Sequence, residues 1–241
     1  MTVAVVVFPG SNCEHDVVHA LKGIGADAEL VWHRDTDLSG AAGVVLPGGF
    51  AHGDYLRTGA IARFSPVMDE VARFASDGRP VLGICNGFQV LCEAGLLPGA
   101  LVANRDLRFI CRPVHLRVES TASVLTAAAT VGDVLRFPLN SYEGNYVAPA
   151  ADIAELETDQ RVVLRYTAPD GSVTDDANPN GSTNAIAGIT NPAGNVAGLM
   201  PHPERGSEEI LGSSDGRILL ESFVASLSTG SLSRTGVTAD V

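Results

Sequence analysis

The sequence predicts an α/β fold, with a doubly wound, mostly parallel sheet and helices on both faces. Two observations lead to this class. Short runs of aliphatic and β-branched residues alternate along the chain with stretches of helical periodicity, as in strands joined by crossover helices. The 241 residues, 45% of them hydrophobic, are enough for one large core but too few for two ordinary domains with a linker.

The first half of the chain has clear element boundaries. Its expected strands are short and mostly apolar, and each is followed by turn residues such as Pro47-Gly48-Gly49. The first helix has a glycine stop signal at Gly23 or Gly25, and a later one places Val67, Val71 and Phe74 on one face. We expect strands over residues 3–8, 28–32, 43–46 and 81–84, and helices over residues 13–23, 65–76 and 87–94.

The second half is less regular. Strands are expected over residues 111–120, 162–166 and 195–200. Residues 168–184 are rich in Pro, Gly, Asp and Asn without periodicity, which predicts a long surface loop whose acidic residues have no Lys or Arg nearby in the sequence. We expect one domain over residues 1–225 and a fraying Ser/Thr/Gly-rich tail over residues 226–241.

Composition argues against several classes of function. A net charge of −12 disfavours binding to nucleic acid or anionic membranes. No apolar run approaches the ~20 residues that span a bilayer, and the N-terminus lacks the basic segment of a signal peptide. Lys22 is the only lysine and follows Leu21, so the chain contains no P-loop. We therefore expect a cytoplasmic protein that binds no cofactor itself and leaves any ATP and Mg²⁺ to a partner chain.

The cysteines and histidines form no recognisable metal motif. Cys13, Cys85, Cys92 and Cys111 contain no C-x-x-C pair and are too few to indicate a disulfide framework. We expect reduced thiols, with Cys92 and Cys111 in the core. A second candidate, the pair His15 and His19 on the first predicted helix, lacks the H-E-x-x-H pattern and favours a solvated helix face, so no metal site is expected.

The strongest local signal is Gly83-Ile84-Cys85-Asn86-Gly87, a thiol version of the G-x-S-x-G nucleophile elbow. A buried strand must turn sharply into a helix here, and the glycines remove side chains that would clash around the turn. The helix N-terminus then favours the thiolate of Cys85. The structural alternative is a buried cysteine without chemistry, which would leave the flanking glycines unexplained.

An oxyanion hole is expected beside this thiol. The backbone N–H of Asn86 lies in the first helical turn and can donate to a developing oxyanion. A second donor can come from Gly48-Gly49-Phe50, because that segment also leaves a strand at the carboxyl edge of the sheet.

The expected proton carrier is His202, in Pro201-His202-Pro203-Glu204, which follows an apolar strand. The flanking prolines disfavour helix and hold the segment extended, so His202 and Glu204 project to the same side. Glu204 can then accept the Nδ1–H and leave Nε2 for the sulfur. A solvated turn with an incidental histidine is the alternative, and the presence of Cys85 favours the triad.

With these residues in view, the chain resembles the class I (triad) glutamine amidotransferases over nearly its whole length. Within them it is most similar to members that serve purine biosynthesis. The segments that carry the resemblance are Phe8-Pro9-Gly10-Ser11-Asn12-Cys13, Val31-Trp32-His33, Pro47-Gly48-Gly49-Phe50-Ala51-His52-Gly53-Asp54-Tyr55-Leu56-Arg57, Gly59-Ala60-Ile61-Ala62-Arg63-Phe64, Gly83-Ile84-Cys85-Asn86-Gly87-Phe88-Gln89, Gly95-Leu96-Leu97-Pro98-Gly99-Ala100 and Pro201-His202-Pro203-Glu204.

The resemblance implies the chemistry and the partners. Cys85 would attack the side-chain amide of L-glutamine, His202 would move protons and Glu204 would orient His202. Gly49 and Asn86 match oxyanion-hole positions, and Gln89 and the backbone near Phe50 match positions in the glutamine pocket. The ammonia would pass to a large synthetase subunit that binds ATP and formylglycinamide ribonucleotide, with a small third subunit bridging the two.

One departure and three alternatives remain. Tyr142 stands where many family members have glycine, in Ser141-Tyr142-Glu143-Gly144-Asn145. The chain could be a class I amidotransferase serving another acceptor, or a degenerate subunit kept for assembly. It could also be a DJ-1/PfpI-like thiol protein, although those proteins usually have histidine directly after the cysteine and this chain has Asn86.

Overall fold

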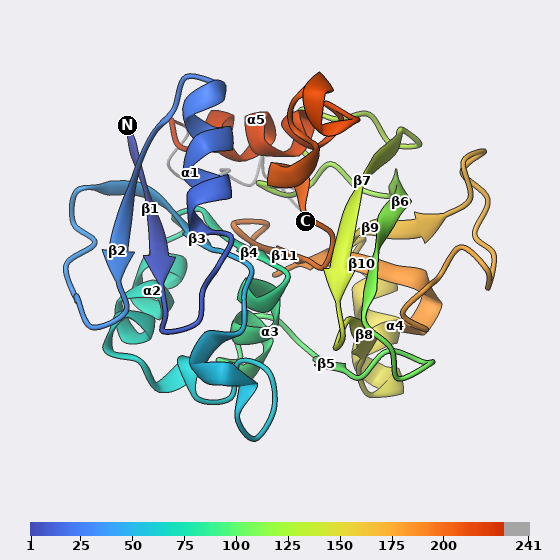
Figure 1. Cartoon of the computed structure of the whole chain (residues 1–241), viewed down its shortest axis with the longest axis horizontal. Coiled ribbons are helices and arrows are strands. Elements are labelled where there is room, and N and C mark those ends of the chain that lie inside the picture. The colour runs from blue at the N-terminus through green and yellow to red at the C-terminus, as the bar shows by residue number, and fades with distance from the viewer. Residues whose placement is uncertain (229–241) are drawn as a thin grey trace, which may run out of the picture.

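The computed structural model describes residues 1–228, which contain one nine-stranded sheet and a separate two-stranded sheet (Figure 1). The strand order of the large sheet is β2-β1-β3-β4-β11-β10-β9-β6-β7. The first five strands in this order are parallel to one another, and the last four continue the sheet in antiparallel fashion. The parallel strands are β2 (Asp27–Trp32), β1 (Thr2–Val7), β3 (Ala41–Leu46), β4 (Val81–Ile84) and β11 (Val196–Leu199).

The antiparallel strands belong to the second half of the chain. They are β10 (Ile186–Thr190), β9 (Val162–Thr167), β6 (Ile110–Val118) and β7 (Val134–Ser141), while β5 (Ala100–Val102) pairs with β8 (Asn145–Val147) in the small sheet. The predicted α/β class is confirmed. The parallel, doubly wound character resides in the first half of the chain together with β11.

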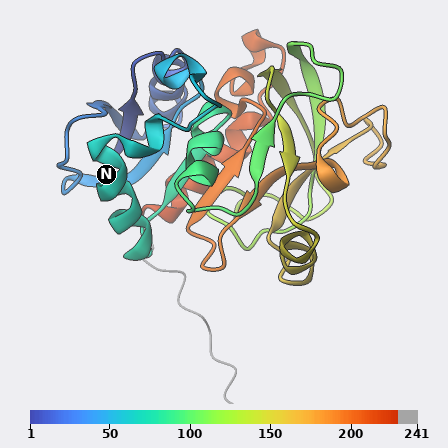
Figure 2. The same ribbon diagram turned by 90° about the horizontal axis from the view of Figure 1, so that it is seen from below.

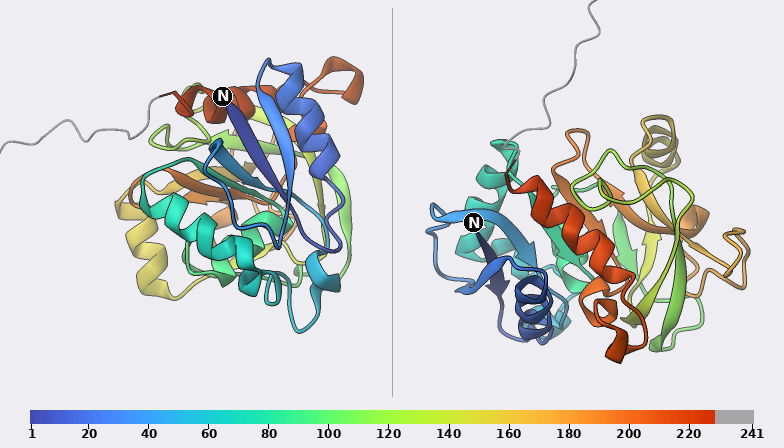
Figure 3. Two further views of the ribbon diagram at one scale, coloured as in Figure 1. Left: turned by 90° about the vertical axis from the view of Figure 1, so that its left-hand side faces the viewer. Right: turned by 90° about the horizontal axis from the view of Figure 1, so that it is seen from above.

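Helices cover both faces of the sheet. Seen from above, α1 and α5 lie side by side over one face (Figure 3), and α2 and α3 lie on the opposite side, seen from below (Figure 2). None of the helices in the described part of the chain is long and apolar enough to cross a membrane. The α-helices are α1 (Glu14–Gly23), α2 (Pro66–Ser76), α3 (Asn86–Glu93), α4 (Ala150–Thr158) and α5 (Gly216–Ser226), and the 3₁₀ helices are η1 (Ala51–Asp54), η2 (Ala62–Phe64), η3 (Thr183–Ala185), η4 (Pro203–Gly206) and η5 (Glu209–Leu211).

Helices α3 and α5 pack closely against the sheet at glycine positions in the strands. A Cβ at Gly43 of β3 would lie 2.4 Å from Leu227 Cδ2 and 3.0 Å from Phe223 Cζ, at the end of α5. A Cβ at Gly198 of β11 would lie 2.1 Å from Cδ2 of Phe88 in α3. The phenyl rings of Phe88 and Phe223 are fully buried, so missing side chains on the strands let both helices pack directly on the sheet.

The predicted strands and helices of the first half are all present, with ends that differ by one or two residues. In the second half, β7 had no prediction, and Pro138 in its middle argues against a strand. The structure tolerates it because β7 is the edge strand, where Pro138 faces Pro113 of β6. Ser226 is the last residue of α5, and residues 229–241 of the expected tail lie outside the described residues.

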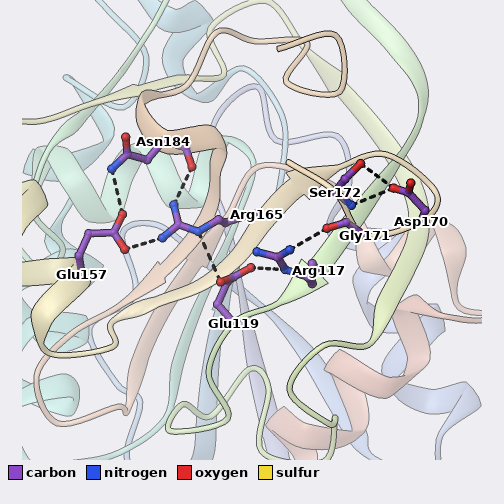
Figure 4. Close-up of polar contacts among 8 residues, drawn as sticks. All are labelled: Arg117, Glu119, Glu157, Arg165, Asp170, Gly171, Ser172 and Asn184. Carbon is purple, nitrogen blue, oxygen red and sulfur yellow. Dashed lines mark hydrogen bonds and ion pairs between the residues drawn. The ribbon is translucent and has the colours of Figure 1, made fainter. Parts of the chain in front are cut away.

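The predicted surface loop, residues 168–184, is held to the rest of the protein by side-chain contacts that the sequence did not indicate. Asp175 forms an ion pair with Arg105 at 2.6 Å, so the loop has a basic partner in space although it has none nearby in the sequence. Arg105 lies 70 residues away in the sequence, which hides the pairing. A second link runs from Arg117 of β6 to the carbonyl oxygen of Gly171 at 2.7 Å (Figure 4).

Arg117 is itself part of a polar network across β6, β9 and α4 (Figure 4). Glu119 accepts from Arg117 Nε at 2.6 Å and lies 3.5 Å from Arg165 Nε. Arg165 also pairs with Glu157 of α4, and Asn184 donates to Glu157 at 2.9 Å. This network connects the loop to the antiparallel part of the sheet, on elements separate from the strand ends described below.

Three neighbouring parallel strands end at the same edge of the sheet. In the register, Leu46 of β3 pairs with Gly83 of β4, and Leu199 of β11 pairs with Ile84 of β4. The residues that follow these ends are Gly48-Gly49, Cys85 and His202. The carboxyl edge of a parallel sheet is where open α/β folds place their sites, so the topology brings the predicted site residues together.

We predict that filling the contact between β11 and α3 destabilises the fold. Gly198→Ala places a methyl group against the ring of Phe88 and should lower the free energy of unfolding by about 1–3 kcal/mol. Gly40→Ala is the matched control, because a Cβ there meets nothing within 4 Å. Urea unfolding of both variants measures the difference, and equal stabilities would contradict the tight packing.

Candidate active site

Cys85 occupies a strained turn between β4 and α3. Its φ of 51° and ψ of −107° lie in a region that non-glycine residues rarely adopt. A Cβ at Gly87 would lie 1.9 Å from the carbonyl oxygen of Leu46, and one at Gly83 would lie 2.7 Å from the backbone of Gly87. The strand, the turn and the helix therefore fit together only with these two glycines, as the elbow motif predicted.

His202 and Glu204 form a buried pair behind this turn. His202 Nδ1 and Glu204 Oε1 are 2.6 Å apart, and both side chains are almost completely buried. The backbone N–H of His202 donates to Pro138 O at 2.7 Å, which fixes the segment to β7. The expectation of an entirely extended segment was wrong, because Pro203 begins the 3₁₀ helix η4, where a proline is tolerated at the first position.

Electrostatics favour a charged imidazole in this pair. Burial alone would lower the pKa of His202, but the carboxylate of Glu204 and the side chains of Cys85 and Cys13 together raise it well above its usual value. Within residues 1–228, His202 Nε2 has no hydrogen-bond partner. The Cys85 thiol donates to Asn140 O at 3.5 Å. The arrangement leaves Nε2 free to exchange a proton with a reacting group.

Gly49 presents its backbone amide to the same pocket. Phe50 N donates to Gly10 O at 2.8 Å and Asn12 N donates to Gly48 O at 3.3 Å, so the pair Ser11 and Gly49 lies between the two bonds. In such a pair the N–H of Gly49 points away from the partner segment. The N–H of Phe50 is therefore occupied by its hydrogen bond to Gly10 O. The N–H groups of Gly49 and Asn86 remain the candidates for the predicted oxyanion hole.

The side chains of Asn86 and Gln89 connect three segments around the pocket. Asn86 Oδ1 accepts from Ala51 N at 3.0 Å, and its Nδ2 donates to Asp54 at 3.2 Å and to Gln89 Oε1 at 2.9 Å. Gln89 Nε2 donates to Glu143 O at 2.6 Å. Both residues were predicted as site residues, and they hold the loop segments that line the pocket.

The pocket also contains acidic groups that the sequence did not single out. Asp54 and Glu143 line it together with Cys85, Gln89 and His202. Burial, followed by the charge of Glu143, raises the pKa of Asp54 to about 6. Burial likewise raises the pKa of Glu143. Asp54 stands in a segment that carried the family resemblance and Glu143 in the segment that departs from it, and only their spatial convergence distinguishes them from surface carboxylates.

Two further aspects were not predicted. Tyr142, the departure from the family pattern, lies beside Glu143 at the pocket and is half-exposed. Cys13 places a second buried thiol next to His202 and Glu204. Burial raises the pKa of the Cys13 thiol, which disfavours its thiolate.

Of the two cysteines expected in the core, one is buried and the other is exposed. Cys92 is buried in α3 as expected. Cys111 is exposed, so its assignment to the core was wrong; β9 pairs only with residues 115–118 of β6 and leaves the other end of β6 uncovered. His19 pairs with Glu208 at 2.5 Å, while His15 is largely exposed.

Known proteins share this fold and most of this sequence. The CobB/CobQ-like glutamine amidotransferase domain matches residues 1–217. A relative from Salinibacter ruber, named phosphoribosylformylglycinamidine synthase subunit PurQ, is 54% identical over 221 residues, which cover 91% of this chain and 94% of the relative. The protein of the same name from Gloeobacter violaceus is 56% identical over 227 residues, covering 94% and 98% of the two chains.

The solved structures agree with the sequences. A chain in the structure of PurLQS from Thermotoga maritima superimposes with a TM-score of 0.83 at 42% identity, covering 94% of this chain and 98% of that one. A structure from Thermoplasma acidophilum, at 16% identity and a TM-score of 0.59, shares the fold. The family domain covers nine-tenths of the chain and includes every residue of the pocket, so this protein belongs to the CobB/CobQ-like glutamine amidotransferase family.

Proposed function

We propose that this chain is the glutaminase subunit of phosphoribosylformylglycinamidine synthase, an ATP-dependent carbon–nitrogen ligase of de novo purine biosynthesis. The observation that carries the proposal is the convergence of Cys85, in its strained turn, with the buried pair His202 and Glu204 at the ends of adjacent strands. The names of relatives at 52–56% identity supply the acceptor reaction.

The geometry supports a thioester mechanism. The Cys85 thiolate attacks the side-chain amide carbon of glutamine, and the N–H groups of Gly49 and Asn86 stabilise the oxyanion. His202 is the imidazolium that donates a proton as the carbon–nitrogen bond breaks and ammonia leaves. The neutral imidazole then takes a proton from water, which hydrolyses the glutamyl thioester and regenerates Cys85. Glu204 holds the ring and stabilises its charge throughout.

The pocket offers charges for a free amino acid. Asp54 and Glu143 lie in its lining and carry the negative charge that an α-ammonium group requires. Asp54 is held by Asn86, which also begins the helix that follows the nucleophile. We assign these carboxylates to recognition of the ammonium end of glutamine. Gln89 and the backbone near Phe50 position the rest of the substrate.

The ammonia is used by another subunit in this proposal. The chain contains no P-loop, so ATP, Mg²⁺ and formylglycinamide ribonucleotide are assigned to a large synthetase subunit, with a small subunit bridging the two. Free ammonium is not a nucleophile, so the ammonia must travel shielded from water. The chain itself needs no cofactor. It functions as one amidotransferase domain over residues 1–225. The four free cysteines, including the nucleophile, suit the reducing cytoplasm.

We predict that Cys85→Ala abolishes glutaminase activity. Removal of the nucleophile should reduce glutamate release by at least about 10³-fold, both for the chain alone and with its synthetase partners. Cys111→Ala, at an exposed thiol, is the control and should retain activity. Glutamate release measured for both variants decides the point. Release that continues in Cys85→Ala would contradict Cys85 as the nucleophile, and no release from the parent chain under either condition would favour a subunit kept for assembly.

We predict that Glu204→Gln lowers kcat by about 10²–10⁴-fold while the fold persists. The amide keeps the shape of the carboxylate but no longer stabilises the charged imidazole, so the pKa of His202 should fall and the proton donor that the leaving ammonia needs is weakened. Steady-state kinetics with circular dichroism as a folding check provide the measurement. An unchanged kcat would exclude Glu204 from the triad.

We predict that kcat/KM for glutamine depends on pH through the ionisation of Asp54. With its pKa raised to about 6, Asp54 is neutral below that pH and charged above it, so kcat/KM for glutamine should rise between pH 5 and 7. Asp54→Asn keeps the acceptor for Asn86 but removes the charge, and should raise KM and flatten this limb. Asp106→Asn, at an exposed position, serves as the control. An identical limb in Asp54→Asn would assign it to another group.

A further inference from the structure

A second thiol lies on the side of His202 that carries Glu204. Cys13 precedes α1, and its side chain is almost fully buried. A Cβ at Gly48 would lie 2.7 Å from His202 Cε1 and 3.0 Å from Cys13 Sγ, so the ring and the thiol pack against the same glycine. The thiol of Cys13 donates to Asn12 Oδ1 at 3.1 Å and also interacts with the side chain of His202. The proposed thioester chemistry gives this sulfur no role.

The three side chains form a set of metal donors. Cys13, His202 and Glu204 each offer one ligand atom, and these atoms lie within 4.8 Å of one another. Thiolate, imidazole and carboxylate are the ligands that zinc uses in proteins. With metal–ligand bonds of about 2.0–2.3 Å, tetrahedral ligands lie roughly 3.3–3.8 Å apart, so ligand atoms within 4.8 Å of one another can surround an ion after small side-chain shifts.

Unused polar atoms provide an independent indication. Among the described residues, Glu204 Oε2 and His202 Nε2 have no hydrogen-bond partner, and both side chains are more than nine-tenths buried. Buried polar atoms without partners are uncommon in folded proteins. Arg205, the nearby cation, is paired with Asp16 at 2.9 Å. The Glu204 carboxylate therefore has an oxygen that is available as a ligand for a cation.

We propose that Cys13, His202 and Glu204 bind a thiophilic divalent cation of the zinc class, and that the bound ion inhibits glutamine hydrolysis. The inhibition rests on the proposed function, whereas the binding does not. On binding, the Cys13 thiol and the His202 imidazolium each release one proton to solvent, and the sulfur, one ring nitrogen and the Glu204 carboxylate form bonds to the metal without any change of oxidation state. The bound ion holds His202 as a neutral ligand and so removes the proton that the imidazolium would donate, and catalysis stops while Cys85 remains chemically intact.

Cobalt binding tests the site without any assay of activity. Co²⁺ is titrated into the full-length chain carrying Cys111→Ala, which removes the exposed thiol. A thiolate-to-cobalt charge-transfer band with tetrahedral visible bands is expected, and it should persist after Cys85→Ala and disappear after Cys13→Ser. A band that survives Cys13→Ser, or that is lost with Cys85→Ala, would overturn the proposal by placing the metal on another thiol.

Zinc inhibition then tests the consequence. Cys13→Ser should hydrolyse glutamine within about threefold of the parent protein, while the Zn²⁺ concentration for half-inhibition rises at least tenfold. An unchanged zinc sensitivity would contradict the proposal. Cys13→Ala provides a second variant if serine disturbs the buried position, with circular dichroism confirming the fold of each. If the parent chain hydrolyses no glutamine, the proposed function fails, and the cobalt titration still decides the metal site.

Discussion

The contact between the first turn of α3 and the end of β3 determines where the nucleophile lies. Gly87 sits so close to the carbonyl oxygen of Leu46 that any side chain there would overlap it. This contact lets the chain leave β4 in one strained residue and start a helix at once. Cys85 is that residue, and its positive φ is maintained because β4 is paired on both sides, with β3 and β11.

Strands β3, β4 and β11 also position the other residues of the site. Because β3, β4 and β11 are adjacent and parallel, the oxyanion donor, the nucleophile and the proton carrier leave the sheet at one edge. The buried ion pair of His202 and Glu204 is stable only because each partner compensates the other in a site that excludes water. Two of its polar atoms have no partner, which is a cost that a purely structural pair would not need to carry.

The elbow at Cys85 and the pairing of His202 with Glu204 could be predicted from the sequence, because each depends on residues close together in the chain. The elbow depends on Gly83 and Gly87 within a few residues of Cys85, and the pairing of His202 with Glu204 depends on a separation of two residues. The pocket acids could not be predicted, because Asp54 and Glu143 meet only after the sheet has formed. The partner of Asp175 was hidden for the same reason, since Arg105 is distant in sequence. In β7, the edge position of Pro138 overrides a residue preference that normally excludes strands.

The central claim is that Cys85, and not the neighbouring thiol of Cys13, is the glutamine-directed nucleophile. The most direct measurement is peptide mapping by mass spectrometry after reaction with an electrophile that mimics glutamine. The account predicts a single modification at Cys85 that glutamine prevents and that Glu204→Gln slows. Modification at Cys13, or labelling of Cys85 that glutamine does not reduce, would contradict it.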